Sequence, residues 1–456
     1  MQKNWAFPQL KELTSFVIGG DWGKDPLLEN SEEFEGVFCI RGSEFKNWNN
    51  KKGETASFRK IKKASLEKRE LKKGDVLLEI SGGGPDQPVG RTVIIDDETL
   101  NRNASYPKVC TNFFRLVRFH ENLNKEFLNH YLQYFYHSGE VVQYQGGSNN
   151  LRNLKYKEYE TINIPLPPLP EQNRIVAKLD KLFEQLEVIN SSLEKIPLLL
   201  KNFRQQVLTQ AVTGKLTEEW RQEKELGEWI ESNIDDVIVS IKSGKNFNCP
   251  GNPVSGDDVG LVKISAVTWG VFDEKQTKTV LDENKINPEL FINKGDFLIS
   301  RANTLELVGS CLIVDSIKHK IMLSDKIWRV SFQNEWTKKF INFYLKSNKG
   351  REEIQSRASG NQHSMRNLSQ KEFKKIPFLK PSLSEQEEIV KRVESLFAKA
   401  DAIESEFNCL KQKLDKLPQS ILHKAFKGEL LPQLESDGDA RELLEGFKQL
   451  KSLFQK

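Results

Sequence analysis

Two segments of the chain, 146–152 and 357–366, combine the side-chain types that bind nucleic acids. Asn and Gln can form two hydrogen bonds with an adenine edge, and Arg can do the same with guanine or grip a phosphate. Glycine lets the backbone of such a loop approach a phosphate closely. The candidate contact residues in the two segments are Ser148, Asn149, Asn150, Arg152, Arg357, Ser359, Asn361, Gln362, His363 and Arg366.

The same residues also admit a structural interpretation. Asn149 or Ser364 could cap a following helix, and the two Arg-Asn-Leu sequences at 152–154 and 366–368 could belong to the scaffold. Loop residues that differ between the two segments therefore receive more weight than the arginines. Runs of charge such as 60–63 are most often solvated surface. The secondary candidates are Arg41, Lys60, Lys62, Arg91, Lys263, Arg301 and Asn303.

Motifs of enzymes that act on DNA are missing from the sequence. An adenine methyltransferase needs an Asn/Asp-Pro-Pro-aromatic loop to hold a flipped base, and no such tetrapeptide occurs. The phosphate-binding pattern G-x-x-x-x-G-K-[ST] does not occur either. The six histidines lack metal-ligand spacing, and the five cysteines form no C-x-x-C pair. The hypothesis of a self-contained DNA methyltransferase or nuclease is therefore disfavoured.

The candidate segments lie in a chain that contains one unit twice. Residues 152–216 align with 366–430 without a gap, and both copies end in Ala-x-x-Gly-x-Leu. This match indicates a duplicated supersecondary unit. Upstream of each copy, a Gly-Asp pair precedes an apolar strand, and a Phe-x-x-x-Tyr-Leu sequence predicts a short helix. The globular parts thus share a skeleton but differ on their surfaces, as two readers of different targets would.

Each copy also predicts a long helix whose apolar residues recur in alternating steps of four and three. Only that spacing keeps a narrow apolar stripe facing a partner helix, so the two helices, each ~57 Å long, are expected to pair as a coiled coil. Pro197 and Pro418 predict a kink or break in each helix. The Pro-rich runs 165–170 and 377–381 predict stiff, non-helical segments before them. The seam residues are Ile175, Leu179, Leu182, Leu186, Ile189, Leu193, Ile389, Val393, Leu396, Ile403, Phe407 and Leu410.

Composition indicates a soluble, folded chain, with 38% hydrophobic and 29% charged residues. The net charge of +4 arises from residues 1–170 and 227–380, where a mild basic surplus could form a polyanion-binding face. No stretch approaches the roughly 20 apolar residues of a membrane span, and the N-terminus lacks a signal pattern. With its scattered cysteines, the chain is expected in a reducing cytoplasm.

Several of these features together resemble one family. They are the Gly-Asp-apolar strand at 295–300, the loop before each Arg-Asn-Leu, the Pro-rich segment followed by Glu-Gln and a heptad helix, and Ala-x-x-Gly-Lys-Leu-Thr-x-x-Trp at 211–220. This pattern resembles the specificity subunit of type I restriction–modification systems, over nearly the whole chain. The resemblance implies an α+β fold with a pseudo-two-fold internal repeat. Two mixed α/β target-recognition domains, 1–165 and 227–380, would be separated by helical spacers, 166–226 and 381–456, whose long helices form an antiparallel coiled coil.

The resemblance also implies partners. Such a subunit binds double-stranded DNA at a bipartite, asymmetric site and assembles with two adenine methyltransferase subunits and two restriction subunits. No cofactor is expected on this chain, whereas S-adenosylmethionine, ATP and magnesium are expected on the partner subunits. Two alternatives stay open: a purely structural coiled-coil adaptor, and a specificity subunit that serves a methyltransferase without restriction partners. Residues 440–455 predict an amphipathic helix that either packs on the chain itself or docks onto a methyltransferase subunit.

Overall fold

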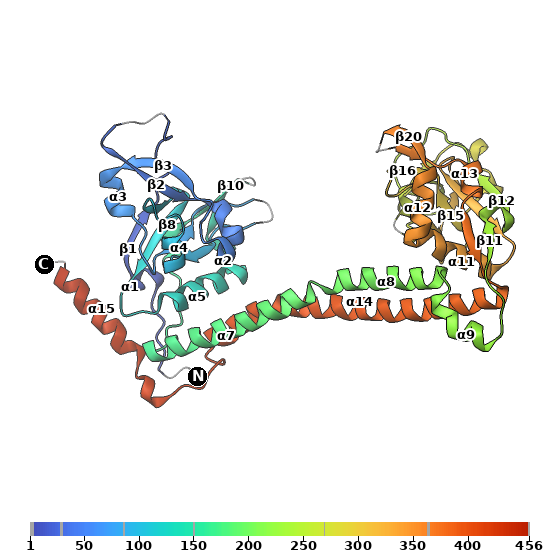
Figure 1. Cartoon of the computed structure of the whole chain (residues 1–456). Coiled ribbons are helices and arrows are strands. Elements are labelled where there is room, and N and C mark those ends of the chain that lie inside the picture. Colours follow the sequence, from blue (N-terminus) through green and yellow to red (C-terminus); the bar gives the residue numbers. More distant parts are fainter. Residues whose placement is uncertain are drawn as a thin grey trace. The chain divides into compact units, whose positions relative to one another are not determined.

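The computed structural model describes residues 4–27, 31–84, 87–148, 151–268, 270–362 and 365–454. The chain forms two compact units: the first contains residues 1–192 and 410–456, and the second contains residues 193–409. Each unit combines a mixed α/β globular domain with one half of the helical part (Figure 1).

In the first unit, a four-stranded antiparallel sheet has the order β1-β8-β4-β6. A second sheet, β3-β2-β7, contains one parallel pair, and a third has the order β5-β10-β9. The strands are β1 (Thr14–Gly19), β2 (Phe34–Ile40), β3 (Ser57–Lys62), β4 (Val76–Glu79), β5 (Ser81–Gly82), β6 (Thr92–Ile94), β7 (Lys108–Cys110), β8 (Phe114–Phe119), β9 (Gln145–Ser148) and β10 (Leu151–Leu154). The helices of this domain are α1 (Leu10–Leu13), α2 (Trp48–Lys51), α3 (Lys63–Arg69), α4 (Asp97–Asn101), α5 (Lys125–His137) and α6 (Tyr156–Tyr159).

The second unit repeats this plan. Its four-stranded sheet, β12-β19-β15-β17, is joined by the sheets β14-β13-β18 and β16-β21-β20 and by the pair β11-β22. The strands are β11 (Ile230–Asn233), β12 (Ile238–Ser243), β13 (Val259–Val262), β14 (Thr277–Val280), β15 (Phe297–Ser300), β16 (Ala302–Asn303), β17 (Cys311–Ile313), β18 (Lys320–Met322), β19 (Ile327–Phe332), β20 (Ser359–Gln362), β21 (Met365–Asn367) and β22 (Pro377–Lys380). The helices are α9 (Glu218–Glu223), α10 (Ser265–Thr268), α11 (Glu335–Lys346), α12 (Asn348–Arg357) and α13 (Gln370–Lys374).

The repeated Gly-Asp pair has the same role in both domains. Gly74 and Gly295 adopt left-handed backbone angles (φ 84° and 89°) in the turn before β4 and β15. The following Asp75 binds Arg118 of the neighbouring strand β8, with an Nε–Oδ1 distance of 2.7 Å. Asp296 binds Arg329 of β19 at 3.1 Å in the same way. The motif therefore fixes both the turn and the adjacent strand, which explains why it occurs twice.

The helical part contains α7 (Leu169–Leu193), α8 (Ile196–Val212) and α14 (Leu383–Phe426). In the first unit, Ile175 and Leu179 near the start of α7 share a core cluster with Leu422 and Phe426 near the end of α14. At the other end of α7, Asn190 accepts a hydrogen bond from Lys411 at 2.9 Å. The two helices are therefore antiparallel in this unit, as predicted.

The second unit has the same antiparallel pairing. Val207 and Ala211 of α8 share a core cluster with Ile389 and Val393 of α14. Earlier in α8, Arg204 binds Asp401 and Glu404 of α14 at 2.6 and 2.7 Å. The prediction of an α+β fold with paired long helices is thus confirmed.

Burial along the predicted seam is uneven. Ile175, Leu179, Ile389 and Val393, which lie next to the globular domains, are at most 1% exposed. Ile189, Ile403 and Leu410 are 47%, 50% and 44% exposed. The remaining seam residues, Leu182, Leu186, Leu193, Leu396 and Phe407, are half-buried. The heptad pattern therefore marks the packing face correctly, but the middle of that face is only partly covered by the chain itself.

The two prolines in the helices behave differently. The helix breaks after Leu193, and Pro197 lies in the first turn of α8, where a missing N–H costs nothing. This confirms the predicted break at Pro197. At Pro418 the helix does not break, since α14 continues through it, so a kink there stays a prediction. The prediction of a non-helical segment at 165–170 is wrong at its end, because α7 begins at Leu169 and Pro170 lies in its first turn, where no N–H is needed; residues 377–380 are the non-helical strand β22.

The repeated Glu-Gln pair anchors each long helix to its globular domain. Glu171 accepts a hydrogen bond from the Trp5 indole at 3.0 Å, and Glu385 accepts one from the Trp229 indole at 2.9 Å. Each following glutamine is also buried. Gln386, for example, accepts a bond from the Thr337 hydroxyl at 2.7 Å. These pairs join helix to domain, which accounts for their recurrence.

The C-terminal helix α15 (Ala440–Phe454) packs on the first unit. Phe447 is 4% exposed and stacks on His120 with ring centroids 4.6 Å apart. Leu443 and Leu444 pack against the same core cluster. The interpretation of core packing is confirmed for this part of the helix, while docking to a methyltransferase subunit stays a prediction.

Candidate nucleic-acid interface

Three of the predicted contact residues in the second unit come together at one small sheet. Asn303 of β16 lies opposite Arg366 of β21 in the antiparallel register. The preceding Arg301 accepts a backbone hydrogen bond from Leu368 at 2.8 Å. Arg301, Asn303 and Arg366 are therefore neighbours, although more than sixty positions separate Asn303 from Arg366 in the sequence.

Beside this sheet lies a cleft of about 500 Å³ lined by Asn303 and Lys263. Two further lysines, Lys278 and Lys326, line it, and among the described residues none of the three lysines forms an ion pair. The nearby Asp325 is 4.0 Å from Arg301. The cleft therefore has a surplus of positive charge, as a surface that binds phosphate requires.

Two arginines at this sheet carry unused donors. The Nε atoms of Arg301 and Arg366 are buried and have no hydrogen-bond partner within the described ranges. A buried, unpaired donor is costly in an isolated chain, so such a group is suited to a ligand that supplies the missing acceptor. Asn303 is partly engaged, since its amide donates to the Thr268 hydroxyl at 3.3 Å.

Lys278 and Lys326 were not among the sequence candidates. Lys278 lies on β14, where Thr277 and Thr279 alternate with it and are buried. That alternation was the available signal for an outward-facing lysine. Lys326 had no such signal, because only the fold brings it beside Lys263.

Most described residues of the two loop segments belong to β-hairpin strands, whereas Arg357 is the last residue of α12. Strands β9 and β10 flank one tip, and β20 and β21 flank the other. Asn149 and Ser364, the alternative helix caps, lie outside the described residues, and the first described elements after them are the strands β10 and β21. The candidates Asn149, Asn150 and His363, together with the side chains of Ser148, Asn361 and Gln362, lie outside the described residues.

A glycine shapes each hairpin. Gly147 and Gly360 have φ angles of 116° and 137°, which L-residues with a side chain rarely adopt. A Cβ atom at Gly147 would lie 2.4 Å from the Leu151 carbonyl oxygen, and one at Gly360 would lie 2.6 Å from that of Met365. Both hairpins therefore require glycine at this position. Two other candidates are near the second hairpin: Ser359 donates to the Asn367 carbonyl at 3.3 Å, and Arg357 forms an ion pair with Glu353.

In the first unit, the equivalent sheet pairs Arg152 with Gly82. Under Gly82 lies Glu79, a buried carboxylate that binds Arg91 through two hydrogen bonds of 2.6 and 2.9 Å. The hydrogen bond to Glu79 raises the pKa of the Arg91 guanidinium further above its ordinary value. Arg41 is held in a similar way by the buried Glu44, at 2.7 Å.

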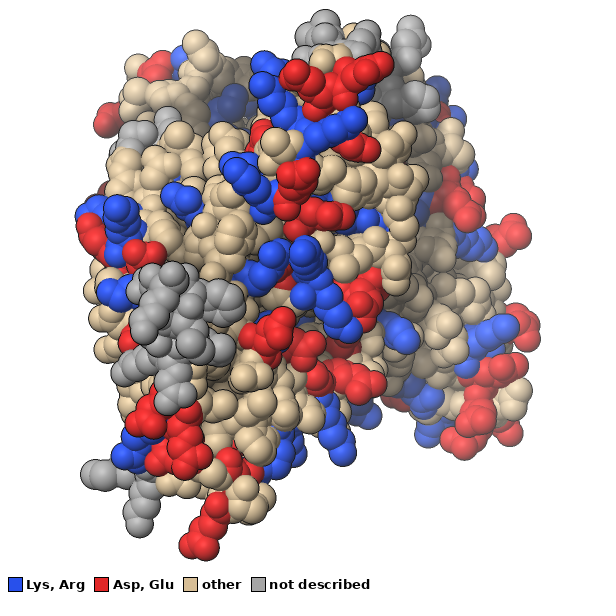
Figure 2. All heavy atoms as spheres, turned by 90° about the vertical axis from the view of Figure 1, so that its left-hand side faces the viewer, with Lys and Arg blue, Asp and Glu red and all other residues tan. Residues whose placement is uncertain are grey.

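The remaining candidates of the first unit, Lys60 and Lys62, lie apart on β3, where Lys62 is exposed. Figure 2 shows a face of this unit on which Lys and Arg side chains alternate with Asp and Glu. The mild basic surplus of residues 1–170 therefore forms no broad basic patch on that face. The sites predicted in the first unit are scattered, whereas those of the second unit converge.

The described part of the chain holds no group of three or more His, Cys, Asp or Glu residues arranged to bind a metal ion. Burial raises the pKa of the Cys110 thiol to about 12, so this cysteine is an inert core residue. Among the described residues, no helix is long and apolar enough to cross a membrane. The candidate interface is thus made of arginine, lysine and amide side chains at or beside small hairpin sheets.

Comparison with known proteins identifies the family. The family model described as "Type I restriction modification DNA specificity domain" matches residues 2–198 and 227–412, one match for each globular domain with its helix. The chain belongs to the type I restriction–modification specificity subunits. The resemblance drawn from its repeated motifs is thereby confirmed.

Relatives match this specificity subunit over its full length. It is 28% identical to the EcoKI specificity subunit of Escherichia coli (strain K12), in an alignment that covers 100% of this chain and 95% of the relative. It is 27% identical to the StySPI specificity subunit of Salmonella potsdam, with the same coverage of 100% and 95%.

Solved structures show the same fold. The HsdS subunit from Thermoanaerobacter tengcongensis superposes with a TM-score of 0.56 at 18% identity, covering 94% of this chain and 98% of that chain. A chain from a study of "complex assembly" and "conformational transition of the type I R-M system" superposes with a TM-score of 0.63 at 17% identity, covering 94% and 99%. The two-unit architecture is therefore shared with specificity subunits.

Proposed function

We propose that this specificity subunit recognises a bipartite, asymmetric DNA site, with each globular domain reading one half-site and the paired helices setting the spacing. The observation that carries the proposal is the repeated hairpin sheet, β5-β10-β9 and β16-β21-β20, whose sequence differs between the two domains. A common scaffold with different tips is what two different half-sites require.

The chemistry of the second domain supports DNA as its ligand. Lys263, Lys278 and Lys326 are suited to phosphates, which position a protein on DNA, and Arg366 and Asn303 are suited to base edges, which specify sequence. The adaptor alternative gives no reason for this convergence of cations and unpaired arginine donors. Those donors favour a polyanion over an apolar protein surface.

The specificity subunit itself is proposed to be non-catalytic. It would place two adenine methyltransferase subunits and two restriction subunits on DNA in the cytoplasm, and a system without restriction subunits remains the alternative assembly. S-adenosylmethionine, ATP and magnesium would be bound by the partners. The family match and the relatives named as specificity subunits support this division of labour.

A methylome tests the proposal. The chain is co-expressed with the methyltransferase subunit encoded beside it, and N6-methyladenine is mapped by single-molecule sequencing. We expect one bipartite motif, modified on both strands across a fixed gap, that disappears when this chain is omitted. Methylation of a single continuous motif, or methylation that does not depend on this chain, would contradict the proposal.

A further inference from the structure

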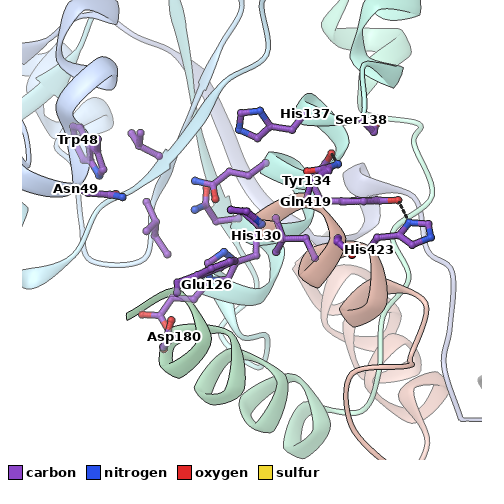
Figure 3. Close-up of a pocket in the computed structure, with 18 of the residues that line it drawn as sticks. Trp48, Asn49, Glu126, His130, Tyr134, His137, Ser138, Asp180, Gln419 and His423 are labelled. Atoms are coloured by element: carbon purple, nitrogen blue, oxygen red, sulfur yellow. Dashed lines mark hydrogen bonds between the residues drawn. The ribbon is translucent and has the colours of Figure 1, made fainter. Parts of the chain in front are cut away.

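A cleft of about 1140 Å³ lies in the first unit, and no residue of the hairpin sheet β5-β10-β9 lines it (Figure 3). Helix α5 forms one wall, with Glu126 and His130, and α7 contributes Asp180 and Phe183. The last turns of α14 close the third side, where the His423 imidazole lies 2.9 Å from the Tyr134 hydroxyl. DNA recognition as proposed above gives this cleft no role.

The internal repeat supplies a reference for this cleft. Because Phe127 of α5 corresponds to Phe340 of α11, Glu126 corresponds to Lys339. On the long helices, Asp180 corresponds to Glu394. In the second unit these positions form an ion pair, with Lys339 Nζ 2.7 Å from the Glu394 carboxylate. The first unit instead has a carboxylate at both positions, and neither forms an ion pair with a described residue.

A second difference lies beside this pair of carboxylates. In the second unit, Phe343 packs on Phe397 with ring centroids 6.1 Å apart. In the first unit, His130 takes the place of Phe343, and its ring centroid lies 5.8 Å from that of Phe183. The second unit therefore shows that the fold can hold a phenylalanine at this position. Nδ1 of His130 is buried and has no hydrogen-bond partner in the part of the chain that the structure describes.

Asn129, which also lines the cleft, is 4% exposed, and its Oδ1 likewise has no partner within the described residues. Its counterpart, Asn342, is satisfied, since the Cys311 thiol donates to its Oδ1 at 3.7 Å. The first unit therefore presents two buried polar atoms without a partner, and two exposed carboxylates, Glu126 and Asp180, that form no ion pair among the described residues. In the second unit, Lys339 pairs with the equivalent carboxylate, phenylalanine replaces the histidine, and the equivalent asparagine oxygen has a hydrogen-bond partner.

The open groups share one chemical character. Burial lowers the pKa of His130 below its ordinary value, so the imidazole is neutral at pH 7 and can offer Nδ1 as an acceptor. Carboxylates and the amide oxygen are acceptors as well. Arginine and lysine side chains carry only donors and a positive charge, so they are complementary to this set. Two lysines also line the cleft: Lys52 is paired with Asp96 at 2.6 Å, and Lys416 follows Asp415, which lines the cleft as well.

We infer that this cleft accepts an arginine or lysine side chain of a partner protein, in the place that Lys339 fills from within the chain in the second unit. The inference rests on the proposed function, because the partner to be probed is the methyltransferase subunit. It makes the two halves of the specificity subunit unequal. One half provides its own cation, and the other receives a cation from the partner.

The test uses the variant Glu126→Lys in the full chain. The new lysine can pair with Asp180 as Lys339 pairs with Glu394, so the thermal unfolding midpoint should stay near that of the wild type. Binding to the purified methyltransferase subunit, measured by calorimetry, should weaken by about tenfold, the order expected when one charge pair at an interface is lost. Unchanged affinity would overturn the inference.

Two further variants keep the outcomes separate. Glu394→Gln is the matched control in the second unit, and it should leave the affinity unchanged. If Glu126→Lys does not fold, the double variant Glu126→Gln with Asp180→Asn removes the charges without adding one and should weaken binding to a similar degree. If the wild-type chain does not bind the methyltransferase subunit at all, the proposed function fails as well. If the wild type binds and the cleft variants bind with the same affinity, only the inference about the cleft is overturned.

Discussion

At the scale of single residues, buried acids divide the arginines of the candidate interface into two groups. Arg91 and Arg41 are bound to Glu79 and Glu44, which are 2% and 5% exposed. Arg301 and Arg366 keep a buried Nε without a partner among the described residues. The first group is thus held by the fold, whereas the second is the group that we propose binds DNA.

Substituting one arginine of each group should separate these roles. Arg366→Ala should weaken binding to the cognate DNA by about 1–3 kcal/mol, the range for an arginine at a base edge, and leave stability almost unchanged. Arg91→Ala should lower the free energy of unfolding by about 3–5 kcal/mol, because it leaves Glu79 buried without its partner. DNA titration and urea unfolding measure the two effects. If Arg91→Ala lost as much DNA affinity as Arg366→Ala and no stability, Arg91 would have to be assigned to DNA binding instead.

His130 makes stability depend on pH. Its pKa is lowered chiefly by burial, against the opposing effects of Asp180 and Gln133. The unfolded chain therefore binds a proton more readily than the native one, and the stability present above the unfolded pKa of about 6.5 is lost as pH falls toward the folded pKa. The variant His130→Phe introduces the residue found at the equivalent position, Phe343. Its thermal unfolding midpoint should exceed that of the wild type by a larger margin at pH 5.5 than at pH 8. An equal shift at both pH values would contradict this.

At the scale of elements, the sequence predicts which face of a helix or strand packs, but not how deeply each residue of that face is buried. The heptad steps locate the seam, the Gly-Asp pair locates β4 and β15, and Phe-x-x-x-Tyr-Leu locates α5 and α11. Each of these patterns is enforced locally by periodicity or by a turn. The hairpin sheet could not be predicted in this way, because pairing such as that of Asn303 with Arg366 depends on long-range register.

Two seam positions that the heptad pattern treats alike should respond differently to truncation. Leu179 is fully buried in the core of the first unit, so Leu179→Ala should cost about 2–5 kcal/mol of unfolding free energy. Ile189 is 47% exposed, and Ile189→Ala should cost under about 1 kcal/mol. Urea unfolding of the isolated chain gives both values. Similar losses at the two positions would show that the middle of the seam is covered in solution.

At the scale of the whole molecule, the two copies share the main sheet and its anchoring contacts but differ in many side chains and in peripheral elements such as α12. Both units have the same order of strands in the main sheet, the same Trp–Glu contact and the same hairpin glycine. They differ in the sequence of the hairpin loops and at the position that is Glu126 in one unit and Lys339 in the other. Composition and motifs could predict the duplication, but the differences acquire meaning only when equivalent positions are compared in the fold.

The central claim is that each domain reads its own half of the DNA site. Its most direct test replaces residues 1–165 with the corresponding segment of another specificity subunit and maps N6-methyladenine in cells that also express the methyltransferase subunit. We expect one half of the methylated motif to change while the other half and the gap are kept. A motif altered in both halves, or in neither, with the chimera folded and active, would contradict the claim.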